Sequence, residues 1–230
     1  MIRFLSNGLL GQPSSQLENG RVVVRPPTLK DWPAWSCLRD QSRSFLTPWE
    51  PTWPPDALSR ETFIRRLRRQ AQEWRNDNGY SYLIFDAKHN VLVGGLSLGN
   101  IRRGVAQTGT IGYWIGQQFT RQGFANAAVC LVLEHAFMTL GLHRIEASCL
   151  PSNNASRNLL QKVGFALEGC ARGYLRIDGS WRDHMLFAIL KEDWVGSSEH
   201  KHAPISNNHP NPTEFLYPIQ TSNGKNGVVV

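Results

Sequence analysis

The chain has 230 residues and a mass of 26.0 kDa, and 41% of its residues are hydrophobic, so it can bury a core of ordinary domain size. Its formal charge of +7 favours acidic partners such as RNA or a phosphorylated cofactor but identifies none. No apolar run approaches the roughly 18 residues of a transmembrane helix. Residues 1–10 also lack the apolar core and cleavage site of a signal peptide.

Composition divides the chain into three parts. Residues 1–20, with several Gly, Pro and Ser, are expected to form a flexible N-terminal segment. Residues 196–230 are rich in Pro and Asn and lose all periodicity, so we expect a disordered C-terminal tail. The two lysines and two glutamates of this tail cancel, so the net charge belongs to residues 1–195. Residues 21–195 read as one α/β domain.

The elements of this domain follow from apolar spacing and turn residues. In chain order we expect a strand at 21–25, a helix at about 31–42, a Pro-rich loop at 48–55, a helix at 58–74, strands at 80–85, 91–98 and 110–115, a helix at 123–140, a strand at 144–150, a helix at 153–163 and strands at 165–177 and 181–190. Asp178-Gly179 between the last two strands predicts a tight hairpin.

The four cysteines indicate neither a metal site nor a redox motif. They are Cys37, Cys130, Cys149 and Cys170. No two of them have the CxxC spacing of a zinc ribbon or a thioredoxin, and we expect no metal. Each lies in an apolar or mixed stretch, which favours reduced thiols in a cytoplasmic protein.

The junction between the strand at 110–115 and the following helix has the features of an anion site. A helix that begins at Gly123 exposes free backbone N–H groups, which bind pyrophosphate together with the helix dipole. Gly123 allows close approach because it has no side chain, and Arg121 could add a positive charge. An ordinary strand-to-helix turn would have the same pattern, and the loop is neither a Walker A nor a GxGxxG motif.

A second pair of polar residues stands at the start of the helix at 153–163. Asn153 and Ser156 are three apart, which places both side chains on one face of the first turn. Capping of the helix N-terminus explains at least one of them.

Several motifs occur together in the second half of the chain. They are Ile111-Gly112-Tyr113, Gly123-x-Ala125, His143-Arg144-Ile145-Glu146, Asn153-x-x-Ser156 and Gly164-Phe165-x-x-Glu168-Gly169. This succession resembles the GNAT superfamily of acetyl-CoA-dependent N-acetyltransferases. Residues 45–51 and 174–184 are similar to a loop and a terminal hairpin of its RimJ/RimL group, the ribosomal-protein N-terminal acetyltransferases, and above all to the alanine-acetylating RimJ branch. The resemblance covers residues 21–194, with one departure: Thr120 stands where the family's phosphate loop usually has Gln or Arg.

The resemblance implies a mixed, mostly antiparallel sheet of about seven strands, with helices on both faces. It places acetyl-CoA in a cleft where the strand at 110–115 splays from the strand at 144–150. The residues that it assigns to the cofactor are Trp114, Ile115, Arg121, Gln122, Gly123, Phe124, Ala125, Asn126, Asn153 and Ser156.

The mechanism implied by the resemblance is direct attack of an amine on the thioester, without an acyl-enzyme. Ser156 would protonate the leaving thiolate, and Asn153 would hold the pantetheine or position a water. Trp49 and Glu50 would hold the ammonium group of the acceptor, with Asp183 also in the substrate site. Three residues remain candidates for the base that takes the amine proton: Glu50, Glu146 and Asp183.

Three further residue arguments accompany this mechanism. An N-terminal α-amine, with a pKa near 8, needs less base strength than a lysine amine near 10.4, which favours an α-amine substrate. A strand histidine such as His184 is more often structural than catalytic. Cys149 has no histidine placed near it by any motif, so we expect no cysteine nucleophile.

Two alternatives remain. A small-molecule N-acetyltransferase would take a polyamine or aminoglycoside, and an acidic acceptor cleft would favour it because such substrates are cations. A ribosome-binding or RNA-binding module that retains the fold is suggested by the helix at 58–74, where Arg65, Arg68, Arg69 and Gln72 share one face. The sequence does not distinguish a monomer from a dimer.

Overall fold

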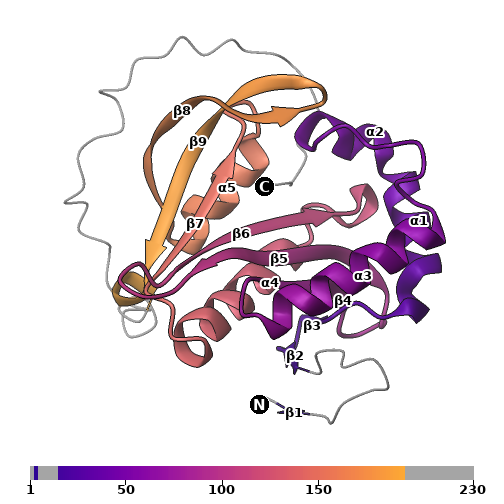
Figure 1. Ribbon diagram of the computed structural model, residues 1–230, viewed down its shortest axis with the longest axis horizontal. Helices are drawn as coiled ribbons and strands as arrows, with labels where there is room; N and C mark the ends of the chain where they lie inside the picture. The colour runs from indigo at the N-terminus through magenta and orange to yellow at the C-terminus, as the bar shows by residue number, and fades with distance from the viewer. Residues whose placement is uncertain (1–2, 5–14, 195–230) are drawn as a thin grey trace.

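The computed structural model describes residues 3–4 and 15–194, and Figure 1 shows their arrangement. The strands are β1 (Arg3–Phe4), β2 (Ser15–Glu18), β3 (Val22–Arg25), β4 (Tyr80–Asp86), β5 (Leu92–Arg102), β6 (Thr108–Ile115), β7 (Arg144–Cys149), β8 (Ala166–Ile177) and β9 (Ser180–Leu190). The α-helices are α1 (Trp32–Gln41), α2 (Arg43–Leu46), α3 (Arg60–Arg75), α4 (Phe124–Glu134) and α5 (Asn154–Val163). The expected tail at 196–230 lies outside the described residues.

One sheet runs through the described part of the chain in the order β1-β2-β3-β4-β5-β6-β7-β9-β8. All of these pairs are antiparallel except β6 with β7, which are parallel. The seven expected strands are β3 to β9, so the predicted mixed, mostly antiparallel sheet is confirmed.

Two strands lie in the segment expected to be flexible, and this part of the prediction needs correction. β2 pairs with β3, and its Leu17 is only 4% exposed. The strand escapes sequence analysis because it is four residues long and carries a single apolar side chain, too little for a periodic signal.

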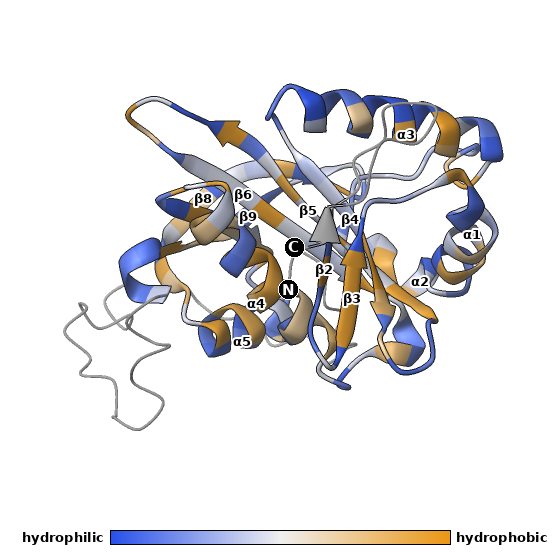
Figure 2. Ribbon diagram, turned by 90° about the horizontal axis from the view of Figure 1, so that it is seen from below, coloured by the Kyte–Doolittle hydropathy of each residue, from blue (hydrophilic) through white to orange (hydrophobic). Residues whose placement is uncertain are grey.

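Helices cover both faces of the sheet, as expected. Figure 2 shows α3 on one side of the strands and α4 and α5 on the other. Alternation along β4 explains the two layers: Tyr82 and Ile84 pack in the cluster that contains α4 and α5, whereas Leu83 and Phe85 pack against α1 and α3. No helix among the described residues is long and apolar enough to cross a membrane.

Two helical segments differ from the predicted ones. The helix expected at 123–140 is α-helical only to Glu134 and continues as a π-helical turn over His135–Thr139. The loop expected from residue 48 begins instead with a short 3-10 turn over Thr47–Trp49, which tolerates Pro48 because the first helical positions need no N–H partner.

The parallel pair β6–β7 separates soon after it begins. The two strands pair at Thr108, Gly109 and Thr110 of β6 and no further, although both strands continue. Figure 1 shows them diverging from this end. The expected splay of these strands is therefore present.

Strand pairing decides which backbone groups face the gap. The Gly116 N–H donates to the Val93 carbonyl at 2.9 Å, so alternate residues of β6, including Trp114, bond toward β5. The N–H and C=O groups of Tyr113 and Ile115 consequently point toward β7. On the facing strand, Lys191 N–H donates to the His143 carbonyl at 2.8 Å, which by the same alternation directs the backbone of Ser148 toward β6.

Candidate active site

A cavity of about 520 Å³ opens on the α1–α3 side of the sheet, beside the gap between β6 and β7. Small residues of neighbouring strands form its floor: Ser81 lies opposite Ser97, which lies opposite Gly112. Because these residues have short side chains or none, the sheet leaves a hollow beneath the covering helices. The volume lies within the roughly 300–1,000 Å³ of ordinary ligand pockets.

Trp114 forms part of the cavity wall because of a glycine on the next strand. Trp114 lies opposite Gly95, and a Cβ atom added at Gly95 would approach the indole Nε1 to 2.5 Å. The indole therefore occupies the space that a side chain at position 95 would need. The sequence prediction placed Trp114 with the cofactor, but its backbone bonds to β5, and Tyr113 and Ile115 present the backbone groups that face the gap.

Asn153 and Ser156 meet at the start of α5, as their spacing predicts. The Asn153 Oδ1 accepts a hydrogen bond from the Ser156 N–H at 3.1 Å, which confirms the capping interpretation. Asn153 is 1% exposed and lines the cavity. Ser156 is fully buried and lies behind that lining.

Tyr113 brings a second hydroxyl to this place. It lines the cavity at the gap, and burial raises its pKa while the neighbouring Ser156 acts in the opposite direction. A phenol with a raised pKa stays protonated at neutral pH and can donate a proton. Ser156 is predicted from the sequence but Tyr113 is not, because its only signal is the Ile-Gly-Tyr motif.

Cys149 also lines the cavity but is poorly suited to be a nucleophile. It is 2% exposed, and burial raises its pKa to about 12, opposed by Arg157. Thiol reactivity requires the thiolate, so this side chain is inert at neutral pH. The structure does bring His184 to the same cavity, which the motifs did not indicate, yet the thiol remains protonated.

Glu50 lines the cavity with most of its acceptor positions occupied. Arg39 donates two hydrogen bonds to it, at 2.7 Å to Oε1 and 2.6 Å to Oε2, and the Trp53 indole donates a third to Oε2 at 2.7 Å. A carboxylate has about four acceptor positions, so roughly one remains on Oε1. Glu50 can thus accept a bond from a substrate ammonium, while its main role in the fold is to hold the loop.

The loop that carries Glu50 is tied over the cavity. The Asp178 N–H, in the turn between β8 and β9, donates to the Glu50 carbonyl at 3.0 Å. Trp49 is half-buried and lines the cavity beside Glu50. The structure therefore brings Trp49, Glu50 and the terminal hairpin together around one space, as the resemblance implies.

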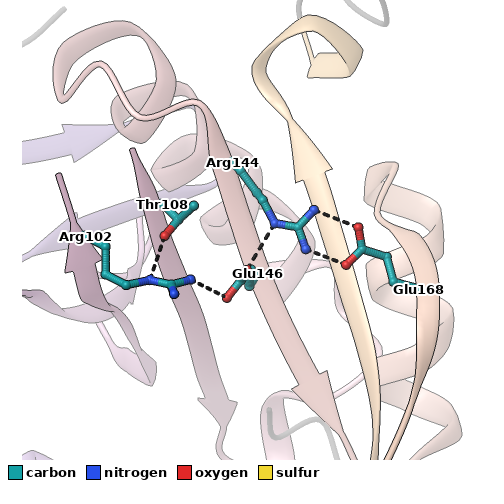
Figure 3. Close-up of polar contacts among 5 residues, drawn as sticks. All are labelled: Arg102, Thr108, Arg144, Glu146 and Glu168. Atoms are coloured by element: carbon teal, nitrogen blue, oxygen red, sulfur yellow. Dashed lines mark hydrogen bonds and ion pairs between the residues drawn. The ribbon is translucent and has the colours of Figure 1, made fainter. Parts of the chain in front are cut away.

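Glu146 lies outside the cavity. Its carboxylate pairs with Arg144 at 3.1 Å and with Arg102 at 3.5 Å, and Arg144 pairs in turn with Glu168 (Figure 3). This chain of charges runs across β5, β7 and β8 on the surface of the sheet. Glu146, one of the three candidate bases predicted from the sequence, is thus held in ion pairs outside the cavity.

Asp183 is exposed and is not among the residues that line the cavity. Its Oδ1 accepts a hydrogen bond from the Gly173 N–H at 2.8 Å, where the pairing of β8 with β9 is irregular. Side chains alternate along a strand, so the neighbouring His184 points the other way and lines the cavity.

His184 has the geometry of a proton acceptor. It is 3% exposed, and its Nδ1 lies 3.0 Å from the Arg182 carbonyl. A carbonyl oxygen only accepts, so Nδ1 carries the hydrogen and Nε2 of the neutral ring is unprotonated. Burial lowers the pKa of His184, which keeps the ring neutral at physiological pH.

The start of α4 has the backbone geometry that an anion cradle requires. Gly123 precedes the helix with φ +82°, and a Cβ atom there would meet nothing within 4 Å. Among the described residues, no backbone hydrogen bond is donated by the N–H groups of residues 121–126. Arg21 donates to the Gln122 carbonyl at 2.8 Å and lies 4.1 Å from the Phe124 ring centroid, which braces the loop. These residues do not line the cavity at the gap.

Charge in the cavity is predominantly positive. Its charged lining residues are Arg39, Glu50, Arg66 and Arg176. None of the three arginines is predicted as a site residue from the sequence, because only the fold brings them to one space.

Donors at a helix start, a splayed strand pair and a substrate-sized cavity together define an acyl-transfer site. A model of the acetyltransferase (GNAT) domain matches residues 21–166. An Escherichia coli ribosomal-protein-uS5-alanine N-acetyltransferase is 33% identical over 186 residues, which cover 80% of this chain and 94% of that protein. The chain belongs to the GNAT family and is an N-acetyltransferase.

Solved structures agree with this assignment. RimJ of Mycobacterium smegmatis in complex with CoA-disulfide is similar with a TM-score of 0.71 and 33% identity, over 80% of this chain and 93% of that one. The ribosomal-protein-S5-alanine acetyltransferase of Vibrio fischeri has a TM-score of 0.72 and 28% identity, over 78% of this chain and 98% of that one. The expected similarity to the RimJ branch is confirmed.

Proposed function

We propose that this enzyme transfers the acetyl group of acetyl-CoA to the N-terminal α-amine of a protein, with a ribosomal protein as the favoured substrate. The observation that carries the choice of acceptor is the charge of the cavity. Its lining holds three arginines and one carboxylate, and Arg39 and Trp53 already engage that carboxylate. A polyamine or aminoglycoside, which carries several positive charges, would meet repulsion there.

Acetyl-CoA supplies an acetyl group activated as a thioester. The N–H groups at residues 121–126 fit its pyrophosphate, because they are free and Gly123 leaves open space above them. The backbone groups of Tyr113, Ile115 and Ser148 that face the gap fit the amides of its pantetheine arm. Asn153 stands between this gap and the cavity and would orient the arm there.

Proton transfer is assigned to residues around the same gap. The attacking amine must lose a proton as its nitrogen bonds to the acetyl carbon, and we assign this proton to Nε2 of His184, whose Nδ1 lies against the Arg182 carbonyl. The carbon–sulfur bond then breaks, and the departing thiolate gains one proton from the Tyr113 hydroxyl, which would recover it from the neighbouring Ser156 hydroxyl. Glu50, with Trp49 beside it, would hold the incoming amine. CoA and an N-acetylated chain are the products.

Direct transfer is favoured over an acyl-enzyme. Cys149 is the cysteine that lines the cavity, and its raised pKa leaves no thiolate at neutral pH. Because the proposed co-substrate and ribosomal proteins belong to the cytoplasm, we place the enzyme there.

The test is acetylation of peptides that begin with Ala or Ser, with release of the CoA thiol as the readout. Mass spectrometry should locate one added acetyl group on the N-terminal amine. A peptide of the same sequence with a blocked N-terminus and an internal lysine should be inert. Turnover of spermidine or kanamycin without turnover of any free N-terminus would contradict the assignment.

A further inference from the structure

Helix α3 presents two polar residues to the end of the cavity farthest from β7. Arg66 and Gln70 are four residues apart and therefore share a face of the helix, and both line the cavity together with Phe63. The neighbouring Arg65 and Arg68 are exposed and are not part of this lining. Arg66 is itself exposed at the surface, but among the arginines of α3 it is the one that lines the cavity.

The positive charge of Arg66 is unmatched. Among the residues that the structure describes, no carboxylate forms an ion pair with it, whereas Glu50 balances the nearby Arg39. The Arg66 guanidinium lies 5.7 Å from the Trp35 ring centroid. Desolvation by the surrounding protein, followed by repulsion from Arg39 and Arg69, lowers its pKa to about 10, so the side chain, which reaches the surface, stays charged at neutral pH. An anion bound in the cavity would offset the repulsion between these arginines.

Gln70 adds an unused acceptor at the same place. Its Oε1 is buried and has no hydrogen-bond partner within residues 15–194. Buried polar atoms usually have a partner, so a ligand that donates a hydrogen bond here would satisfy it.

We propose that Arg66 binds the carboxylate of an acidic side chain close to the N-terminus of the acceptor peptide, and that Gln70 accepts a backbone N–H of the same peptide. The inference rests on the proposed function and names the class of peptide that the site prefers. A carboxylate is favoured over a phosphate because one unmatched arginine supplies one charge and a two-pronged donor set, which suit a carboxylate.

Strand spacing predicts the position of this acidic residue. α3 packs on β4, while the acetyl group would lie at the edge of β7, three strands away. Paired strands lie about 4.8 Å apart and β6 diverges from β7, so the separation is at least about 14 Å. An extended chain advances about 3.3 Å per residue, which corresponds to about four residues. The side chains of Arg66 and of the acidic residue shorten this span, so we expect the carboxylate at the second to fourth position.

The experiment compares initial rates on peptides that begin with Ala and carry Glu, Gln or Lys at position 2, 3, 4 or 8. Each peptide is offered at low salt to the wild-type enzyme, to Arg66→Gln, to Arg66→Glu and to the control Arg68→Gln. At the preferred position, wild type and Arg68→Gln should favour Glu over Gln by about tenfold in kcat/KM, as expected for a charge-assisted hydrogen bond. Arg66→Gln should abolish this preference, and Arg66→Glu should favour Lys at the same position.

The outcomes separate this subsite from the proposed function. Equal rates on Glu and Gln peptides in the wild type, or a preference that survives Arg66→Gln, overturn the subsite while acetylation of α-amines stands. Turnover of no peptide overturns both. Circular dichroism of the variants checks folding, and reversal by Arg66→Glu cannot arise from an unfolded protein.

Discussion

The carboxylate of Glu50 and the guanidinium of Arg39 form a two-pronged pair, with N–O distances of 2.7 Å and 2.6 Å, inside the cavity. Their side chains are 13% and 10% exposed, so this pair is largely removed from water. It joins helix α1 to the loop that covers the acceptor space, and the Glu50 carbonyl joins that loop to the terminal hairpin. The pair therefore couples stability to the shape of the substrate site.

Breaking this pair should reduce both stability and peptide binding. Arg39→Leu leaves Glu50 without its main partner and should lower the free energy of unfolding by about 3 kcal/mol, measured in urea. Glu50→Gln should raise KM for the peptide and leave KM for acetyl-CoA unchanged. Asp40→Asn, in the exposed pair with Arg43, should change stability by less than about 0.5 kcal/mol. An equal loss of stability in Asp40→Asn would contradict the expectation that the buried pair stabilises the fold more than the exposed pair does.

Substitution of His184 should remove a proton acceptor. His184→Gln should lower kcat by about 100-fold or more, the usual contribution of a general base. Burial lowers the pKa of His184 below its ordinary 6.5, so wild-type activity should persist above that pH and fall as the pH drops through the lowered value. The variant should lose this acidic limb. His89→Gln, in the exposed turn after β4, serves as control.

The same shift predicts how stability depends on pH. The folded protein binds fewer protons at His184 than the unfolded chain, which has the ordinary pKa of 6.5. This contribution to stability is therefore present above pH 6.5 and lost as pH falls through the folded pKa. His135 shifts in the same direction. The urea midpoint of wild type should therefore fall more between neutral and acidic pH than that of His184→Gln, and an equal fall in both proteins would contradict this.

Filling the space at Gly95 should displace Trp114. Gly95→Ala places a methyl group against the indole and should cost about 1–3 kcal/mol of stability, with a loss of kcat/KM for the peptide. Gly99→Ala lies on the same strand with nothing within 4 Å and should have little effect on kinetics. Trp114 fluorescence should report the displacement. Equal kinetics of the two variants would show that the indole is not part of the acceptor wall.

The cradle at the start of α4 can be tested with two glycines of similar backbone. Gly123 has φ +82° and Gly104 has φ +65°, and a Cβ atom at either meets nothing within 4 Å. Both alanine variants should therefore lose similar stability through backbone strain. Only Gly123→Ala should raise KM for acetyl-CoA, because its methyl group and shifted N–H groups disturb the phosphate site. A rise in KM for acetyl-CoA in both alanine variants would point to a general effect of backbone strain.

Local patterns anticipate much of the fold. Helix α3 begins and ends within two residues of the predicted bounds, because Phe63 and Leu67 recur at helical spacing and Ser59 caps the start. Asn153 caps α5 as its type and position predict. β2 and the π-helical turn after α4 were not predicted, since a single buried Leu17 and a change of helical register leave no periodic trace in the sequence.

The residues of the site divide in the same way, into those that local sequence predicts and those that only the fold brings together. Gly123 before a helix and the Asn153–Ser156 spacing are local features, so the sequence alone determines the glycine-led start of α4 and the capped start of α5. The cavity depends on residues far apart in the chain: Ser81, Ser97 and Gly112 meet across three strands. The place of Arg66 in the cavity lining and the choice of His184 over Asp183 were likewise decided only by tertiary packing. Side-chain burial and charge balance are set by neighbours in space, which local spacing does not specify.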